Sequence, residues 1–400
     1  VRPAMRLLLA GAALLSAAAY YVYLPLPGGV CEPVKLMLLD ALFRSFIQAS
    51  DVAHALGVCH RVHLLNRVVS WVEEVEARSC SAVHVTDSQL GGVPARVFQP
   101  KGGRRLKRGV VYFHGGGWAL GSGRMRSYDR LCRKMAEDLD CVVVSVDYRL
   151  APEAVFPDQY HDALAAARAF LSAPVLERYG VDPQRLCVSG DSAGGNLAAA
   201  VAQELGSDRG AAPRFKLQAL IYPVLQALDF HTASYQQNQA VPILHRPLMA
   251  RFWLQYLGAD ASLEPLLLAN NHSALDQRAK LDWTALLPAE RRKHFRPVVR
   301  EGGAAGALPG LTDPRAAPLL AESAVLSATP KAYVMTCEFD VLRDDGLMYA
   351  RRLRDAGVAV TSDHYEDGFH GCMVFAFPPV ASAVGRRSIN GYVRWLDQNL

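Results

Sequence analysis

One short run of the sequence combines a nucleophile with the glycines that would expose it. Gly190, Asp191, Ser192, Ala193 and Gly194 read G-D-S-A-G, which has the G-x-S-x-G form. An apolar segment precedes the run and an alanine-rich segment follows it, so we expect a sharp turn between a strand and a helix. Such a turn lifts a serine hydroxyl clear of the sheet. Ser192 is therefore the predicted nucleophile of a hydrolase that cleaves an ester or amide bond.

A second glycine-rich run lies earlier in the chain. His114, Gly115, Gly116 and Gly117 read H-G-G-G and directly follow a short apolar segment. Glycines at this position let backbone N–H groups approach a substrate oxygen that becomes negatively charged during acyl transfer. We therefore predict an oxyanion hole made by the N–H groups of Gly115, Gly116 and Ala193.

A serine nucleophile also needs a base, and an acid that orients the base, in the chain order Ser, Asp or Glu, His. His370 lies in a G-F-H-G loop after the last predicted strand and is the predicted base; His364 falls within that strand. Asp340 follows the preceding predicted strand and is the predicted acid, which holds the imidazole in one tautomer. Rival acids nearby are Glu338, Asp344 and Asp345.

Alternating short strands and helices must position these residues. The predicted strands are 109–113, 141–146, 185–189, 217–222, 332–336 and 359–365, and the predicted helices are 128–139, 158–171, 193–205, 344–356 and 388–400. Residues 83–86 and 95–98 look like a hairpin before them. This alternation is typical of an α/β fold, here an α/β-hydrolase fold with a mostly parallel central sheet flanked by helices.

The segments outside this alternation suggest a domain organisation. We expect a catalytic domain at 81–400 and, within it, an aromatic-rich cap insertion at about 225–325. Residues 28–80 form a helical, membrane-proximal region, in which 34–49 have the apolar spacing of an amphipathic helix. That helix would lie on a membrane surface, cap the active site or simply pack on the domain. Residues 1–27 are the predicted N-terminal anchor.

The anchor prediction rests on an uncharged apolar run. Residues 7–24 carry no charge, follow Arg2 and Arg6, and would span about 27 Å as a helix. This pattern favours a single-pass signal anchor that leaves the catalytic domain on the lumenal side of an internal membrane or on the outer side of the cell membrane. A cleaved signal peptide, with Ala17 and Ala19 near its end, and a buried core helix are the alternatives.

Composition excludes little but agrees with a hydrolase. The chain has 43 basic and 38 acidic residues spread along the sequence, which argues neither for nor against a nucleic-acid partner. Since the motifs indicate a hydrolase, we expect no nucleic-acid partner. Its eight cysteines form no C-x-x-C pair, so we predict no metal site, and the triad needs no cofactor. Asn271 begins an N-x-S triplet and is a predicted glycosylation site.

These motifs together resemble a known family, the hormone-sensitive-lipase branch of the α/β hydrolases and within it the arylacetamide deacetylase group. The resemblance to the branch rests on H-G-G-G-W at 114–118, D-Y-R-L-A-P-E at 147–153, G-D-S-A-G-G-N at 190–196 and the Asp340 and His370 pair. The closer resemblance to the arylacetamide deacetylase group rests on 20–23, 35–40, 217–230, 234–238, 367–373 and 395–400. It covers nearly the whole chain and is weakest around 72–107 and 276–312.

The resemblance implies a single-pass hydrolase of the endoplasmic reticulum membrane with a glycosylated lumenal domain. Its substrates would be cholesteryl esters and acetylated ether glycerolipids. Asp282 stands where members of the group can carry a glycosylated asparagine, so one glycan should be missing. An amidase that acts on arylacetamides, or a general carboxylesterase, is the alternative within the family. A binding protein that has lost catalysis is disfavoured because all three triad positions are filled.

Overall fold

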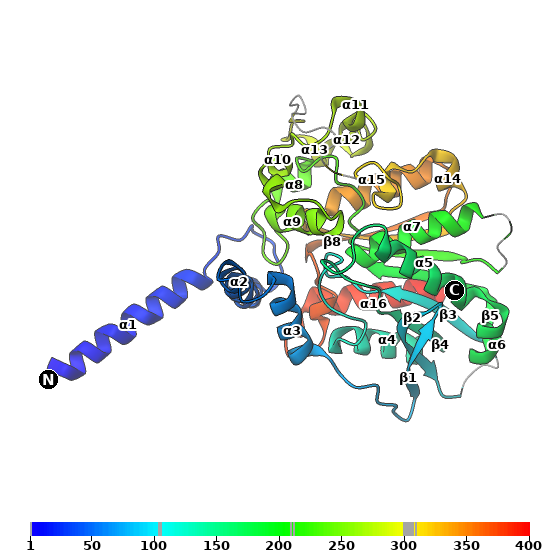
Figure 1. Ribbon diagram of the computed structural model, residues 1–400, viewed down its shortest axis with the longest axis horizontal. Coiled ribbons are helices and arrows are strands. Elements are labelled where there is room, and N and C mark those ends of the chain that lie inside the picture. Colours follow the sequence, from blue (N-terminus) through cyan, green and yellow to red (C-terminus); the bar gives the residue numbers. More distant parts are fainter. Residues whose placement is uncertain (1, 103–105, 209, 211–212, 299–307, 309) are drawn as a thin grey trace.

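A central sheet of eight strands organises the molecule (Figure 1). The computed structural model describes residues 2–102, 106–208, 210, 213–298, 308 and 310–400. The strands are β1 (Val83–Leu90), β2 (Val93–Pro100), β3 (Lys107–Phe113), β4 (Cys141–Val146), β5 (Val181–Asp191), β6 (Leu217–Ile221), β7 (Lys331–Phe339) and β8 (Val360–Phe369). They lie side by side in the order β1-β2-β4-β3-β5-β6-β7-β8. The pairs β1/β2 and β2/β4 are antiparallel and the others are parallel, which confirms the predicted mostly parallel sheet and the hairpin.

Helices cover both faces of this sheet (Figure 1). On one face lie α4 (Arg126–Leu139) and α16 (Ala383–Asn399), and on the other α5 (Asp158–Leu171), α7 (Ala193–Ser207) and α15 (Arg343–Asp355). The short α6 (Ala173–Tyr179) leads into β5. Every residue of β4 is buried, as expected for a valine-rich strand covered on both sides.

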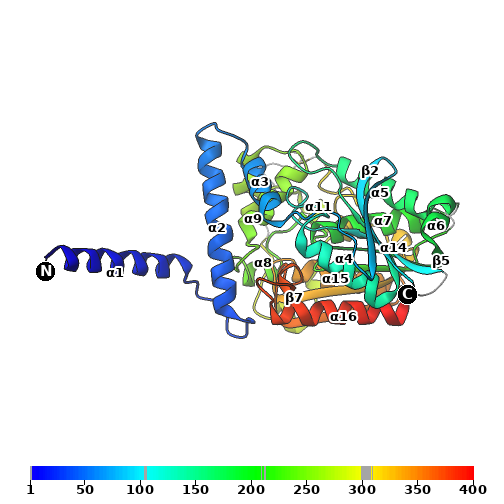
Figure 2. The same ribbon diagram turned by 90° about the horizontal axis from the view of Figure 1, so that it is seen from below.

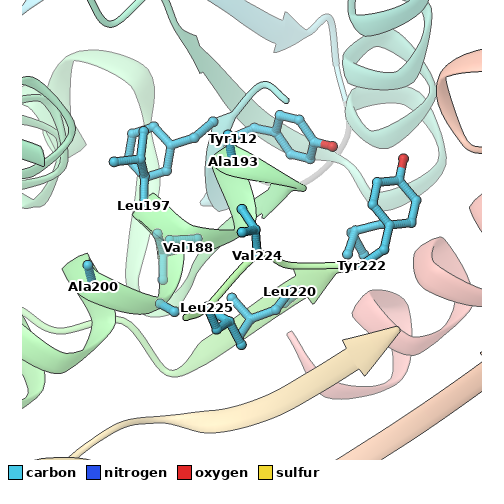
Figure 3. Packing of buried hydrophobic residues seen from close by; sticks show 14 of the residues in the cluster. Tyr112, Val188, Ala193, Leu197, Ala200, Leu220, Tyr222, Val224 and Leu225 are labelled. Carbon is cyan, nitrogen blue, oxygen red and sulfur yellow. The ribbon is translucent and has the colours of Figure 1, made fainter. Parts of the chain in front are cut away.

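The packing of α7 on the sheet holds the turn that precedes this helix. Small and aliphatic side chains make the contact, including Val188 of β5, Leu197 of α7 and Leu220 of β6, all fully buried (Figure 3). Because β5 ends at Asp191 and α7 begins at Ala193, a single residue, Ser192, connects the two elements. The sheet and the helix therefore fix the position of that residue from both sides.

Three helices precede the sheet in the chain. They are α1 (Arg2–Val22), α2 (Pro33–Ala55) and α3 (Arg61–Glu73). Both views show α1 extending away from the body, with α2 between α1 and the body (Figures 1 and 2). Among the residues that the structure describes, no helix is both long and apolar enough to cross a membrane. The anchor at 1–27 stays a prediction.

Short helices between β6 and β7 fill the segment predicted as a cap insertion. They are α8 (Ala233–Gln237), α9 (Arg246–Tyr256), η1 (Ala261–Leu263), α10 (Glu264–Leu268), α11 (Leu275–Arg278), α12 (Trp283–Leu286), α13 (Ala289–Arg292), η2 (Pro318–Leu320) and α14 (Ser323–Ser327), and a last turn, η3 (Val374–Ala376), follows β8. Residues 299–307 of the insertion lie outside the described residues. The buried Asp229 holds part of this segment together, because it accepts hydrogen bonds from Asn270 and the Trp283 indole.

Candidate active site

Ser192 occupies a sharp turn between β5 and α7, as the G-x-S-x-G motif predicts. Its backbone has φ 55° and ψ −119°, a combination that a residue with a side chain adopts only under constraint. The Ser192 N–H donates to the carbonyl of Ile221 at the end of β6 (2.9 Å). A Cβ at Gly194 would lie 2.0 Å from the Phe113 carbonyl oxygen, so only glycine permits this close approach of helix and strand.

The imidazole of His370 lies between Ser192 and Asp340. His370 Nε2 is 2.9 Å from Ser192 Oγ, and His370 Nδ1 is 2.8 Å from Asp340 Oδ2. Since a carboxylate can only accept, Nδ1 carries the proton and Nε2 presents its lone pair to the serine hydroxyl. The structure thus brings together the three residues predicted from widely separated parts of the chain.

Each of these residues follows the carboxyl end of a parallel strand. Ser192 comes after β5, Asp340 directly after β7, and His370 directly after β8. The carboxyl ends of parallel strands lie at the same edge of a sheet, where ligands of open α/β sheets usually bind. Asp340 is fully buried, and its other oxygen accepts the Leu342 N–H at 2.8 Å, which fixes the carboxylate plane.

The rival candidates have partners elsewhere. Glu338 accepts hydrogen bonds from Arg343 (2.8 Å) and Arg291 and contacts His364 at 3.2 Å. Burial alone would raise the pKa of Glu338, but the hydrogen bond from His364 and the charge of Arg343 lower it to about 2. Glu338 and His364 are therefore members of an ion-pair network and are not in hydrogen-bonding contact with the Ser192 side chain.

Asp344 and Asp345 also have hydrogen-bond partners away from Ser192. Asp344 accepts the Ser234 N–H, and Asp345 accepts the Leu225 N–H at 2.9 Å. Burial raises the pKa of Asp345 to about 8, which makes it a neutral carboxylic acid at pH 7. Both side chains fix the start of α15 against the segment that follows β6.

The prediction of Gly115 as an oxyanion donor was wrong. Its N–H donates to Asp191 Oδ1 at 3.0 Å and also lies 2.9 Å from the Tyr128 hydroxyl oxygen, so it is already satisfied. All three glycines line the pocket beside Ser192, so the hydrogen bond to Asp191 is what sets Gly115 apart from Gly116 and Gly117. Ala193 is the first residue of α7, where backbone N–H groups have no partner within the helix. The geometry thus favours Gly116, Gly117 and Ala193 as the donors.

Asp191 has a structural role that the motif alone does not reveal. The buried carboxylate accepts the Tyr112 hydroxyl (3.0 Å), the Tyr128 hydroxyl (3.2 Å) and the Gly115 N–H. Burial raises the pKa of Asp191 to about 6, although the hydrogen bonds from the two tyrosines oppose the shift. A charged residue at the end of a buried strand requires such donors, which is the signal that could have pointed to Tyr112 and Tyr128.

His114 also stabilises the conformation of the glycine run. It is fully buried, its Nδ1 donates to the Gly115 carbonyl at 2.7 Å, and its ring stacks on Tyr148 with 4.5 Å between ring centroids. Burial lowers the pKa of His114, so the ring is neutral. The Tyr148 hydroxyl donates to the His114 carbonyl at 2.7 Å, which holds the loop in place.

The pocket above Ser192 is apolar, with a cavity volume of about 180 Å³. Its only polar side chains belong to Tyr128, Asp191, Ser192 and His370 among the described residues, and the remaining lining residues are glycine or apolar. Most of the walls come from separate parts of the chain. They are Phe43 and Val69 of α2 and α3; Leu120 and Met125 after the glycine run; Ile243, Leu244, Leu248, Met249 and Phe252 in and before α9; and Val374 and Phe375 after β8. Such a site suits a lipophilic acyl group or alcohol.

Two further predictions concern the surface of the protein. Asn271 is half-buried, and the buried Ser273 of its triplet donates to the Leu228 carbonyl at 3.0 Å; whether Asn271 carries a glycan stays a prediction. Asp282, at the position of the expected missing glycan, caps α12 by accepting the Thr284 N–H. Among the residues that the structure describes, no three histidine, cysteine or acidic side chains are grouped to hold a metal ion.

Comparison with known proteins agrees with this architecture. A family model described as an alpha/beta hydrolase fold matches residues 110–292 and 299–374. Neutral cholesterol ester hydrolase 1 of Pongo abelii is 52% identical over 399 residues, 97% of this chain and 98% of that protein. Arylacetamide deacetylase of Mus musculus is 44% identical over 389 residues, 96% of each chain.

Solved esterase structures are similar as well. A Pyrobaculum calidifontis esterase superposes with a TM-score of 0.64 at 29% identity, covering 88% of this chain and 97% of that one. A thermostable esterase from Pseudomonas putida gives a TM-score of 0.67 at 27% identity, covering 94% of this chain and 99% of that one. The shared fold therefore extends over most of the chain.

Proposed function

The chain belongs to the arylacetamide deacetylase group, in the hormone-sensitive-lipase branch of the α/β hydrolases, and is a carboxylic ester hydrolase. From this premise we propose that it cleaves esters of lipophilic substrates through an acyl-enzyme on Ser192. The observation that carries the proposal is the hydrogen-bonded chain from Ser192 through His370 to Asp340 at the base of an apolar pocket.

The proposed reaction follows from the proton positions in this chain. Ser192 Oγ attacks the ester carbonyl carbon while His370 Nε2 takes its proton, and Asp340 stabilises the imidazolium that forms. The carbonyl oxygen becomes an oxyanion, which the N–H groups of Gly116, Gly117 and Ala193 stabilise. His370 then protonates the departing alcohol.

The second half of the reaction releases the acid. Water enters the pocket, loses a proton to His370 Nε2 and attacks the acyl carbon, and the proton then passes to Ser192 Oγ as it leaves. Every step uses side chains and backbone groups of this chain, so the proposal requires no metal or organic cofactor.

We propose cholesteryl esters and acetylated monoalkylglycerol ethers as the substrates. The apolar lining of the pocket and the 52% identity to a neutral cholesterol ester hydrolase support this choice. The 44% identity to an arylacetamide deacetylase favours an amide of the arylacetamide type as a second candidate. Both candidates would use the same triad, because the triad does not distinguish an ester from an amide.

A substrate panel tests the proposal. Purified full-length protein is assayed on cholesteryl oleate, an acetylated monoalkylglycerol ether and an arylacetamide, with Ser192→Ala as the blank. We expect hydrolysis of the two esters to exceed that of the amide, and a fluorophosphonate probe to label wild type but not Ser192→Ala. Faster cleavage of the amide would favour the second candidate, and equal labelling of both proteins would refute the role of Ser192.

For location, we propose a single-pass protein of the endoplasmic reticulum membrane with a lumenal catalytic domain. The uncharged run at 7–24 and the exposed Leu14, Leu15 and Tyr20 of α1 support this proposal. The test is alkaline extraction of membranes together with endoglycosidase treatment of wild type and Asn271→Gln. Asn271 begins the only N-x-S/T triplet of the sequence. Lumenal placement therefore predicts a membrane-retained protein whose mass falls on deglycosylation in wild type but not in Asn271→Gln. Release by alkali, or a wild-type mass that deglycosylation leaves unchanged, would contradict it.

A further inference from the structure

Two buried thiols lie close in sequence to the acid and the base of the catalytic triad. Cys337 Sγ and Cys372 Sγ are 3.8 Å apart, and both side chains are fully buried. Cys337 belongs to β7, three residues before Asp340, and Cys372 lies two residues after His370. The pair therefore links the strand that carries the acid to the loop that carries the base.

The surroundings of the two sulfur atoms differ. Cys337 sits where the pairing of β7 with β8 shifts register, and a Cβ at Gly368 would lie only 2.8 Å from Cys337 Sγ. Cys337 is paired with Tyr365 of β8, and β7 is paired with β6 up to Met335, two residues before it, so Cys337 has little freedom to move. Cys372 instead lies in the turn after β8, where its N–H donates to the Phe369 carbonyl at 3.2 Å.

We propose that Cys337 and Cys372 form an oxidative modification site, which a peroxide converts to a disulfide that lowers esterase activity by displacing His370. This inference rests on the proposed function, because its consequence is read as slower ester hydrolysis. Neither thiol takes part in the proposed hydrolysis itself.

The chemistry consumes one peroxide for each pair. A thiolate sulfur attacks one peroxide oxygen, the O–O bond breaks, and the products are a sulfenic acid and hydroxide, which is protonated to water. The second thiol then attacks the sulfenic sulfur, the S–O bond breaks, and water leaves. Both sulfur atoms are oxidised, both peroxide oxygens are reduced to water, and the two thiol protons end up in that water.

Geometry explains why activity should fall. A disulfide has an S–S distance of about 2.05 Å, so the two sulfur atoms must move substantially closer than their present 3.8 Å. Because Cys337 belongs to a paired strand and Cys372 to a turn, closing this gap moves the turn, and His370 moves with it. The hydrogen bonds of His370 are already at 2.8 and 2.9 Å. A displacement of about 1 Å at a catalytic group can cost about 10² in rate.

Burial also determines how fast each thiol reacts with peroxide. Burial raises the pKa of Cys337, so little of its reactive thiolate is present at neutral pH. Exposed Cys80 is the opposite case, since a hydrogen bond from the Val83 N–H lowers its pKa. We therefore expect Cys80 to react first with peroxide and the buried pair to respond only to sustained exposure.

The experiment separates these thiols. Reduced full-length wild type, Cys372→Ser, Cys337→Ser and the control Cys80→Ser are treated with hydrogen peroxide, blocked with N-ethylmaleimide and examined by peptide mass spectrometry. Hydrolysis of a short soluble ester is measured before oxidation, after it and after dithiothreitol. We expect a Cys337–Cys372 linked peptide and an activity loss of about tenfold or more, reversed by dithiothreitol, in wild type and Cys80→Ser but in neither single variant of the pair.

Three results would overturn the proposal. They are the absence of the linked peptide once Cys80 is fully oxidised, a linked peptide without loss of activity, and an equal loss in Cys372→Ser. If the variants of the pair fail to fold, the linked peptide and the reversible loss in wild type still decide the question. A reduced wild type without esterase activity would refute the proposed function, whereas peptide mapping would still report on the disulfide.

Discussion

The backbone N–H of Gly115 donates a hydrogen bond to the carboxylate of Asp191, with 3.0 Å between the two atoms. Gly115 belongs to the run that follows β3, and Asp191 ends β5, directly before Ser192. The same carboxylate also accepts the hydroxyl groups of Tyr112 and Tyr128. One buried carboxylate thus ties the glycine loop to the turn that carries the nucleophile.

Removing this carboxylate should lower the rate more than it lowers binding. We expect Asp191→Ala to reduce kcat by up to about 10², because loss of one oxyanion donor costs about 10²–10³ and here the donors are displaced but not removed. KM for a short ester should change little. Tyr112→Phe is the matched control, since it removes one donor to Asp191 but keeps the bond to Gly115. Steady-state kinetics on a soluble ester checks this, and an unchanged kcat in Asp191→Ala would contradict it.

The choice between Asp340 and Glu338 as the triad acid can be measured directly. Asp340→Asn should reduce kcat by about 10⁴, because the amide favours the wrong tautomer of His370. Glu338→Gln should leave kcat nearly unchanged while it lowers the melting temperature, since Glu338 contacts Arg343, Arg291 and His364. Kinetics and thermal melts on both variants provide the test. A larger kcat loss in Glu338→Gln than in Asp340→Asn would reverse the assignment.

The helices before the sheet should affect which acyl chains are accepted. Phe43 of α2 lines the pocket, so Phe43→Ala should raise KM for long-chain esters by about tenfold, in line with the loss of apolar contact. Acetate esters should be almost unaffected. Phe46→Ala is the control, because Phe46 is partly buried on the same helix but does not line the pocket. If both variants change KM for all chain lengths equally, α2 does not select the acyl group.

Because Asp345 is buried, we expect the stability of the protein to depend on pH. Its pKa is raised by burial to about 8 in the folded protein, against about 3.9 in an unfolded chain. Between these values the folded state holds a proton that the unfolded state has lost, so the free energy of unfolding falls as pH rises. The contribution of protonated Asp345 to the free energy of unfolding is fully present below about pH 4 and is lost as pH passes 8.

Asp345→Asn should remove that dependence. We expect the melting temperature of the variant, relative to wild type, to increase steadily from pH 5 to pH 8, by the equivalent of up to about 4 kcal/mol. Asp355→Asn on the same helix is the control, because the Asp355 carboxylate is exposed and lacks the burial that causes the effect at Asp345. A difference between Asp345→Asn and wild type that is the same at both pH values would show that Asp345 is ionised in the folded protein.

The positions of Ser192, Asp340 and His370 could be predicted because each follows a strand that apolar patterning identifies. The use of the Gly115 N–H could not, since it depends on how the Asp191 carboxylate packs against Tyr128 in three dimensions. Strand lengths were also underestimated: β7 continues from the predicted 332–336 through Phe339, and β8 through Phe369. Polar residues such as Glu338 interrupt the apolar pattern there, although pairing of the strands continues.

The distances along the chain between the triad residues have a kinetic consequence. Ser192 and His370 are separated by 178 positions in the sequence. The strands β6, β7 and β8 must pair next to β5 before the two side chains can meet. Contacts of such long sequence separation form late, because a large loop must first be ordered. Recovery of activity during refolding should therefore lag behind the return of helical signal, and a nascent chain should remain inactive until its last strand has emerged.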